Sequence, residues 1–163
     1  MKLSLVGAVT LIVMACGLLA PAACRAEQCP WLNAATASGF LGGEVRMSVT
    51  PLKANGDATC DFVLTQNSVA STLRIAVHTM SQPAQDYTAF VAQCDGVRTP
   101  LRTIGNEAIY CVASGKEQII GRVRDRAFAI TIATASASSS RKAGSGPSDE
   151  AINLAQQVAG QLF

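Results

Sequence analysis

The stretch STLRIAVHTMSQPAQDYTAFVAQCDG, residues 71–96, decides the fold class, because its hydrophobic period changes partway along. In its first part, apolar side chains alternate with polar or small ones from Leu73 to Val77, which predicts a strand with one apolar face. In the remainder, an apolar stripe at i, i+3, i+4 and i+7 runs from Tyr87 to Cys94, which predicts a helix that packs on a sheet. A strand followed by an amphipathic helix therefore forms the middle of the chain.

Helices and strands are also predicted on both sides of this stretch. The other two helices are predicted at residues 29–43 and 148–163. The predicted strands are residues 44–52, 58–65 and 71–80, then either 99–104 or 106–113, then 116–123 and 126–134. The resulting order, α-βββ-α-βββ-α, favours an α+β fold in which helices cover one face of an antiparallel sheet.

The N-terminus carries the features of a secretory signal peptide. A basic residue precedes a long apolar run, and small residues follow it. Cleavage after Ala26 places small side chains at the required positions, giving a signal peptide of residues 1–26 and a single exported domain of residues 27–163. Two alternatives stay open, namely a retained membrane helix and a lipid anchor on Cys16 or Cys24 of a bacterial lipoprotein.

The predicted mature chain keeps four cysteines: Cys29, Cys60, Cys94 and Cys111. An even number of cysteines in a short exported chain predicts two disulfides. Three pairings are open, and we favour Cys29–Cys60 and Cys94–Cys111, which join neighbours along the chain. Four reduced, buried thiols are the alternative. Disulfides would place the protein in the periplasm or the extracellular space.

Charge and composition argue against several classes of ligand. Without Lys2 and Arg25, 11 basic residues balance 11 acidic ones, so we expect no nucleic-acid partner. No two cysteines have C-x-x-C spacing and there is one histidine, so we expect no metal site. No glycine-rich phosphate loop opens a helix, so we expect no cofactor. Residues 135–147 are rich in Ser and Gly and predict a flexible, exposed loop.

Catalytic residues do not form a familiar pattern in this chain. His78 falls on the strand face opposite the apolar residues, so we expect it at the surface. The sequence has no G-x-S-x-G motif, and its one S-x-x-K match, Ser139 to Lys142, lies in the Ser-rich segment. We expect Asp57 and Asp61, which flank a turn and a strand, to serve in solvation and capping. An enzyme of unfamiliar type is therefore our third hypothesis.

The segment GRVRDRAF, residues 121–128, contains the one concentration of positive charge. Arg122, Arg124 and Arg126 fall around the predicted turn of a hairpin. Three guanidinium groups there predict a clamp for a carboxylate, a phosphate or an acidic polymer, since each binds such groups through two hydrogen bonds. A charged hairpin tip that only maintains solubility and discourages edge-to-edge association is the alternative.

The segment TIGNEAIYC, residues 103–111, carries a resemblance to known proteins. Gly105-Asn106-Glu107-Ala108, followed by a strand, a hairpin and a closing helix, resembles the second half of small exported actinobacterial lipoproteins. The related extracellular sensor domain of mycobacterial Ser/Thr kinases is similar. Those families carry an early cysteine on a helix and another within a strand, as Cys29 and Cys60 are here. The resemblance implies a non-enzymatic exported domain that binds a ligand or partner.

These observations favour a small exported bacterial binding or interaction module. Its expected partner is a protein or a small anionic ligand, and it would meet a membrane only through the signal peptide or a lipid anchor. The second hypothesis is an inhibitor of an envelope or host enzyme, in which residues 122–126 would form a rigid inserting loop.

Overall fold

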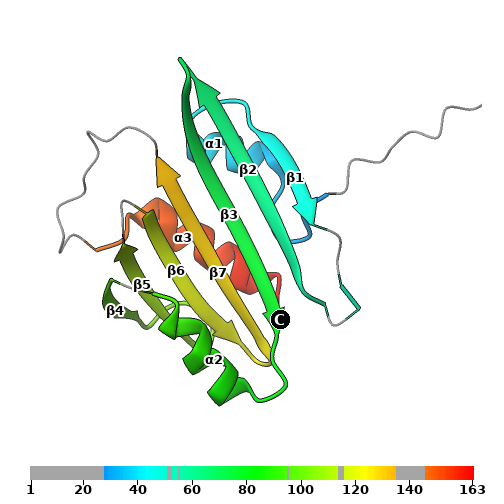
Figure 1. Cartoon of the computed structure of the whole chain (residues 1–163), viewed down its shortest axis with the longest axis vertical. Coiled ribbons are helices and arrows are strands. Elements are labelled where there is room, and N and C mark those ends of the chain that lie inside the picture. The colour runs from blue at the N-terminus through cyan, green and yellow to red at the C-terminus, as the bar shows by residue number, and fades with distance from the viewer. Residues whose placement is uncertain (1–27, 51–52, 55, 95, 114–115, 135–145) are drawn as a thin grey trace, which may run out of the picture.

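We describe the fold from a computed structural model, which describes residues 28–50, 53–54, 56–94, 96–113, 116–134 and 146–163. Seven antiparallel strands form one sheet in the order β1-β2-β3-β7-β6-β5-β4 (Figure 1). The elements are α1 (Ala34–Leu41), β1 (Arg46–Thr50), β2 (Ala58–Gln66), β3 (Val69–Thr79), α2 (Pro83–Ala92), β4 (Val97–Leu101), β5 (Glu107–Ala113), β6 (Lys116–Val123), β7 (Arg126–Thr134) and α3 (Asp149–Gly160). The predicted α+β fold with an antiparallel sheet and three helices is confirmed.

Two details of the predicted order differ from the structure. The second half contains four strands rather than three, because the two segments that we had treated as alternatives both form strands, β4 and β5. The first helix begins at Ala34 rather than near Pro30. Asn33 caps it, because its side-chain oxygen accepts a hydrogen bond from the backbone N–H of Thr36 at 2.8 Å.

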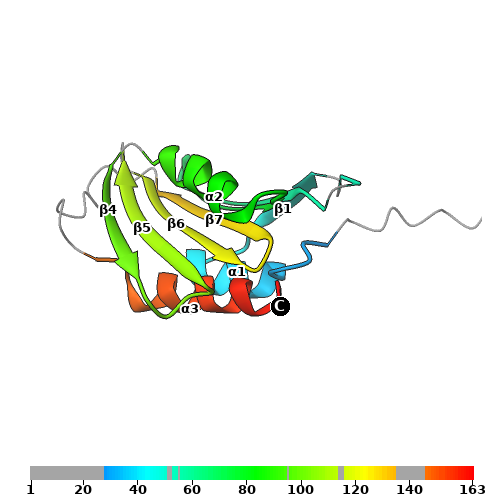
Figure 2. The same cartoon turned by 90° about the horizontal axis from the view of Figure 1, so that it is seen from below.

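Helices cover both faces of the sheet, so the prediction of a single covered face is wrong. Figure 2 shows α1 and α3 together on one face and α2 on the opposite face. Hydrophobic periodicity identifies the apolar stripe of a helix, but it does not determine which side of the sheet that stripe contacts. The molecule consequently has two separate hydrophobic cores.

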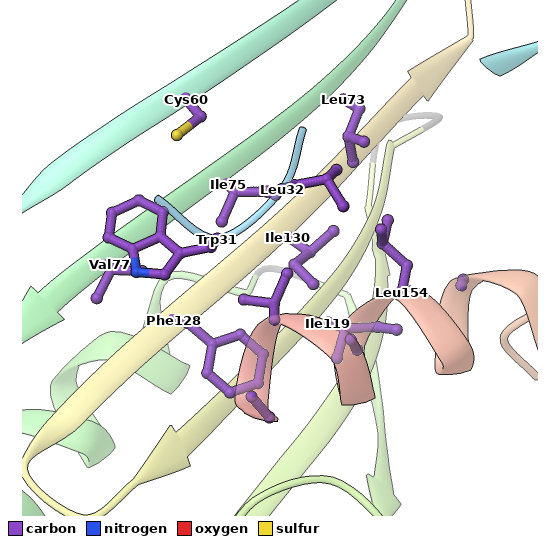
Figure 3. Close-up of a cluster of buried hydrophobic side chains, with 14 of the residues drawn as sticks. Trp31, Leu32, Cys60, Leu73, Ile75, Val77, Ile119, Phe128, Ile130 and Leu154 are labelled. Atoms are coloured by element: carbon purple, nitrogen blue, oxygen red, sulfur yellow. The ribbon is translucent and has the colours of Figure 1, made fainter. Parts of the chain in front are cut away.

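The larger core lies between the sheet and helices α1 and α3. Leu73, Ile75 and Val77, the alternating residues of β3, are 0–1% exposed and belong to it. In Figure 3, Trp31 and Leu32 come from the segment before α1, and Leu154 comes from α3. Side chains from two ends of the chain therefore cover the same face of the central strands, which fixes the register of the sheet.

The smaller core lies beneath α2 on the opposite face. Tyr87 and Cys94, from the predicted stripe, are buried there against the sheet, and Phe90 and Val91 are partly buried beside them. The sheet residues of this core come from β5, β6 and β7: Cys111, Ile120 and Ala127. Helix α2 lies over β5, β6 and β7. Among the described residues, no helix covers the same face of β1 and β2.

Both predicted disulfides are present. Cys29–Cys60 joins the segment before α1 to β2, and Cys94–Cys111 joins the end of α2 to β5. Each bond lies in one of the two cores. Two disulfides in a small domain are typical of an oxidising, non-cytoplasmic compartment. Among the described helices, none has the length and apolar character needed to cross a bilayer.

The predicted signal peptide, residues 1–26, lies outside the described residues, as does most of the predicted Ser/Gly-rich loop at 135–147. Ser148 caps α3, since its hydroxyl oxygen accepts the backbone N–H of Ala151 at 3.2 Å.

Candidate functional site

A cleft lies between α2 and the edge of the sheet formed by β4 and β5. Its volume is about 490 Å³, within the usual range for sites that bind small molecules. The cleft is lined by Tyr87, Thr88, Val91, Pro100, Leu101, Arg102, Asn106, Glu107, Ala108 and Ile109. One wall is therefore a helix and the other is an edge strand with its neighbour.

The local sequence explains why this cleft has an apolar floor. Pro100 of β4 pairs in register with Ile109 of β5, so both side chains project from the sheet on the same face. Ile109 is partly buried against the smaller core, together with Val91 of α2. A proline is tolerated in β4 because this strand is at the edge of the sheet, where a missing backbone N–H does not interrupt a ladder on both sides.

Two contacts hold α2 in place relative to the strands that form the other wall of the cleft. The disulfide Cys94–Cys111 attaches the C-terminal end of the helix to β5. The hydroxyl of Tyr87 donates a hydrogen bond to the backbone carbonyl of Ile120 on β6, at 3.3 Å. Burial, the main cause, and the nearby carboxylate of Glu107 raise the pKa of Tyr87 to about 12. The phenol is thus neutral at physiological pH, and its hydroxyl hydrogen is donated to the carbonyl of Ile120.

The charged side chains of the cleft are not equivalent. Glu107 is neutralised by Arg122, whose Nε lies 2.6 Å from the Glu107 Oε1. Arg102 is exposed and forms no hydrogen bond or ion pair with any other residue that the structure describes. Of the two charged residues in the described lining, Glu107 is therefore paired with a residue outside the cleft, and Arg102 has no side-chain partner among the described residues.

The tetrapeptide Gly105-Asn106-Glu107-Ala108 shapes the end of the cleft. Gly105 has φ +59°, and a β-carbon there would clash with the backbone oxygen of Arg122. The side-chain oxygen of Asn106 accepts the backbone N–H of Arg124 at 2.6 Å. This loop is thus attached to the β6–β7 hairpin, and the motif that carries the resemblance has a structural role here.

The three arginines of the β6–β7 hairpin do not converge on one point. Arg122 is in register with Ala127 on the α2 face, whereas Arg126 is in register with Val123, which belongs to the larger core on the opposite face. Arg124 occupies the turn with φ +54°. The structure therefore does not bring the three guanidinium groups together as the predicted clamp.

Each of the first two arginines also has a partner within the protein. Arg122 contacts Glu107, as described above. The Nη1 of Arg124 donates to the backbone oxygen of Phe163 at 3.0 Å, and its guanidinium lies 5.6 Å from the centre of the Phe163 ring. Arg124 consequently attaches the C-terminal residue to the hairpin turn.

His78 is partly exposed, as expected, but it has a partner that the sequence did not reveal. Its Nδ1 lies 3.0 Å from the Oδ2 of Asp57, and the other oxygen of Asp57 accepts the backbone N–H of Thr79 at 2.9 Å. Asp57 is only 8% exposed, so the prediction that it is solvated is wrong. The His78 ring meets the edge of Phe90 on α2, with ring centres 5.3 Å apart.

A second, smaller pocket of about 270 Å³ lies beside this pair. It is lined by His78, Thr79, Met80, Asp86, Ala89, Phe90, Gln93 and Ala127. A histidine oriented by a carboxylate can act as a general base. Within the part of the chain that the structure describes, no His, Cys, Asp and Glu side chains group as metal ligands.

Comparison with known proteins gave no match to this chain among family models, curated proteins or solved structures. The resemblance to actinobacterial lipoproteins and kinase sensor domains stays a prediction.

Proposed function

We propose that this protein is a small exported bacterial binding module, which works in the periplasm or outside the cell and takes a small ligand in the cleft between α2 and β4–β5. The two disulfides support an oxidising compartment. The leader-like residues 1–26 support export. A lipid anchor on Cys16 or Cys24 is the alternative to release as a free protein.

The observation that carries this proposal is the composition of the cleft. An apolar floor with a few polar groups at its rim is typical of small-molecule sites, because burial supplies affinity and the polar groups supply orientation. The walls are held by the disulfide Cys94–Cys111 and the hydrogen bond of Tyr87, so they are already in place before a ligand arrives. A preformed site loses less conformational entropy on binding.

The two other hypotheses have weaker support. An inhibitor that inserts residues 122–126 would have to release Arg122 and Arg124 from their contacts with Glu107 and Phe163 before they could bind an active site. An enzyme could use His78 and Asp57, which form a pair suited to proton transfer among the described residues. Turnover of a substrate that is lost in His78→Ala would favour the enzyme over the binding module.

The proposal can be tested with protein recovered from an exporting bacterial host. The wild type and two variants would be incubated with an extract of envelope small molecules, separated from free compounds, and denatured so that retained compounds are identified by mass spectrometry. Thr88→Trp places a bulky ring in the cleft from an exposed position on α2. Gln85→Trp is the matched control, because Gln85 is also exposed on α2 but does not line the cleft.

We expect the wild type and Gln85→Trp to retain the same compound and Thr88→Trp to lose it. Retention by all three proteins would show that the ligand binds elsewhere. Retention by none would contradict a small-molecule function.

A further inference from the structure

We propose that the ligand of the α2–β4 cleft is an amphipathic monoanion, an apolar body that ends in a single carboxylate or phosphate-type group, with the anionic group held by Arg102. This inference rests on the proposed function, because it names the class of ligand for the same cleft. It differs from the clamp predicted at residues 122–126, since it uses a different arginine and only one.

The charged side chains that line the cleft favour a ligand of negative charge. Glu107 and Arg122 neutralise one another through a contact of 2.6 Å, so the guanidinium of Arg102 is the uncompensated charge among the described residues of the lining. An exposed guanidinium such as that of Arg102 can still bind a carboxylate or phosphate-type group through two parallel hydrogen bonds. A cationic head group would instead approach an unpaired cation, which is unfavourable.

Three other arginines in this half of the chain already have partners within the protein. The Nη2 of Arg98, on β4, donates to the backbone oxygen of Cys94 at 3.0 Å. Arg122 and Arg124 have the partners described above. Arg102 is the one arginine among the described residues that line the cleft, and its guanidinium is left to bind a ligand.

The apolar floor selects the body of the ligand. Val91 and Ile109 are partly buried and continue into the smaller core, and Pro100 projects beside them. The hydroxyl of Tyr87 donates to the carbonyl of Ile120, so its ring contributes mainly an apolar wall. A polar body such as a sugar would leave its hydroxyls without partners over this floor, whereas an alkyl chain would remove apolar surface from water.

Decanoate is a suitable test compound, because it combines a ten-carbon apolar body with one carboxylate. Its binding would be measured by titration calorimetry below the concentration at which it forms micelles. Decanol and decyltrimethylammonium are the neutral and cationic comparisons of the same length. Arg102→Gln removes the proposed anchor, Arg46→Gln removes an exposed arginine at the opposite edge of the sheet, and Thr88→Trp blocks the cleft.

We expect decanoate to bind the wild type and Arg46→Gln equally and not to bind Thr88→Trp. Its affinity for Arg102→Gln should be about tenfold or more weaker, because this change removes the charge-assisted contact between the guanidinium and the carboxylate. Decanol should bind Arg102→Gln and the wild type alike, and more weakly than decanoate binds the wild type. Decyltrimethylammonium should bind least.

Two results would overturn the inference in distinguishable ways. Equal binding of all three compounds, lost in Thr88→Trp but unaffected by Arg102→Gln, would refute the anionic class while the cleft remained a ligand site. Decanoate binding that Thr88→Trp does not reduce, or no binding of any compound, would refute both the inference and the proposed position of the site.

Sedimentation with lipid vesicles distinguishes a free amphiphile from a membrane lipid with the same head-group charge. If decanoate binds but the protein does not sediment with phosphatidylglycerol vesicles, the ligand is a free amphiphile. Sedimentation that Thr88→Trp abolishes would assign the anionic group to a membrane lipid.

Discussion

Gly121 shows how a single side-chain position sets the packing between two central strands. It lies on β6 directly opposite Phe128 of β7, whose ring is fully buried and occupies the space above the glycine. A β-carbon at residue 121 would lie 2.6 Å from the Cε1 of Phe128 and closer still to its Cζ. A glycine at this position thus allows an aromatic ring to fill the larger core without displacing β6.

We therefore expect Gly121→Ala to lower the free energy of unfolding by about 1–3 kcal/mol, because the Phe128 ring must move within a packed core. The measurement is urea denaturation of the purified protein. Gly39→Ala is the matched control: Gly39 is an exposed helical residue with open space around it, and its replacement should stabilise the protein by about 0.5–1 kcal/mol. Equal effects of the two changes would contradict this account of the core.

Tyr87 predicts how stability responds to alkaline pH. The folded protein raises the pKa of this phenol from 10.0 to about 12, so between these values the folded state keeps a proton that the unfolded state releases. Its contribution to stability is complete below pH 10 and is lost as the pH rises through about 12. We expect the urea midpoint of the wild type to fall between pH 10 and pH 11 by more than that of Tyr87→Phe. Parallel decreases in the two proteins would contradict the prediction.

At the scale of elements, the two disulfides have different consequences. Cys94 and Cys111 are 17 residues apart and join α2 to β5, whereas Cys29 and Cys60 are 31 residues apart and lie in the larger core. Loop-closure entropy predicts a loss of about 3–4 kcal/mol on removal of either bond. Only the first bond fixes a wall of the cleft, so only its removal should loosen α2 relative to the sheet.

We test this with two double variants, Cys94→Ala/Cys111→Ala and Cys29→Ala/Cys60→Ala. In the first, amide hydrogen exchange of residues 83–92 should accelerate relative to that of β3, and decanoate affinity should fall. In the second, which serves as the control, exchange of both segments should change together, since the loss of stability is global. Preferential exchange of α2 in both variants would mean that Cys94–Cys111 has no special role in holding it.

The elements also show why the sequence predicted some parts of the fold better than others. β3 was predicted because its apolar residues alternate and one face is buried. β4 was not separated from the strand after it, because four of its five residues are exposed and Pro100 interrupts any strand signal. The disulfides were predicted correctly because four cysteines allow only three pairings, and the pairing of neighbours along the chain is the one that forms.

The candidate site was harder to predict than the elements, because its residues are far apart in the sequence. Val91 lies on α2 and Ile109 on β5, and only the strand register brings them to one cleft. From the sequence alone, Arg102 cannot be distinguished from any other polar residue that follows a strand, because its neighbours in the cleft come from other elements. Asp57 was expected to be solvated, because its partner His78 follows 21 residues later and on another strand. A local pattern cannot report such contacts.

At the scale of the whole molecule, every feature of the proposal depends on export. The disulfide that supports the cleft is typical of an oxidising compartment, and the leader-like residues 1–26 would deliver the chain there. The state of the six cysteines in the recovered protein therefore tests the compartment and the processing of the chain together. Those of the described domain are paired, whereas Cys16 and Cys24 fall in the predicted leader.

We expect the intact mass of protein from an exporting bacterial host to correspond to a chain that begins at Glu27. Alkylation should add no groups before reduction and four groups after it, one for each cysteine of the two disulfides. A cytoplasmic preparation of residues 27–163 is the control, since there the same four thiols should react without a reductant. A mass that begins at Cys16 or Cys24 and carries acyl chains would instead establish a lipoprotein. In that case the cleft would work beside a membrane, and an amphipathic ligand would reach it from the lipid rather than by free diffusion.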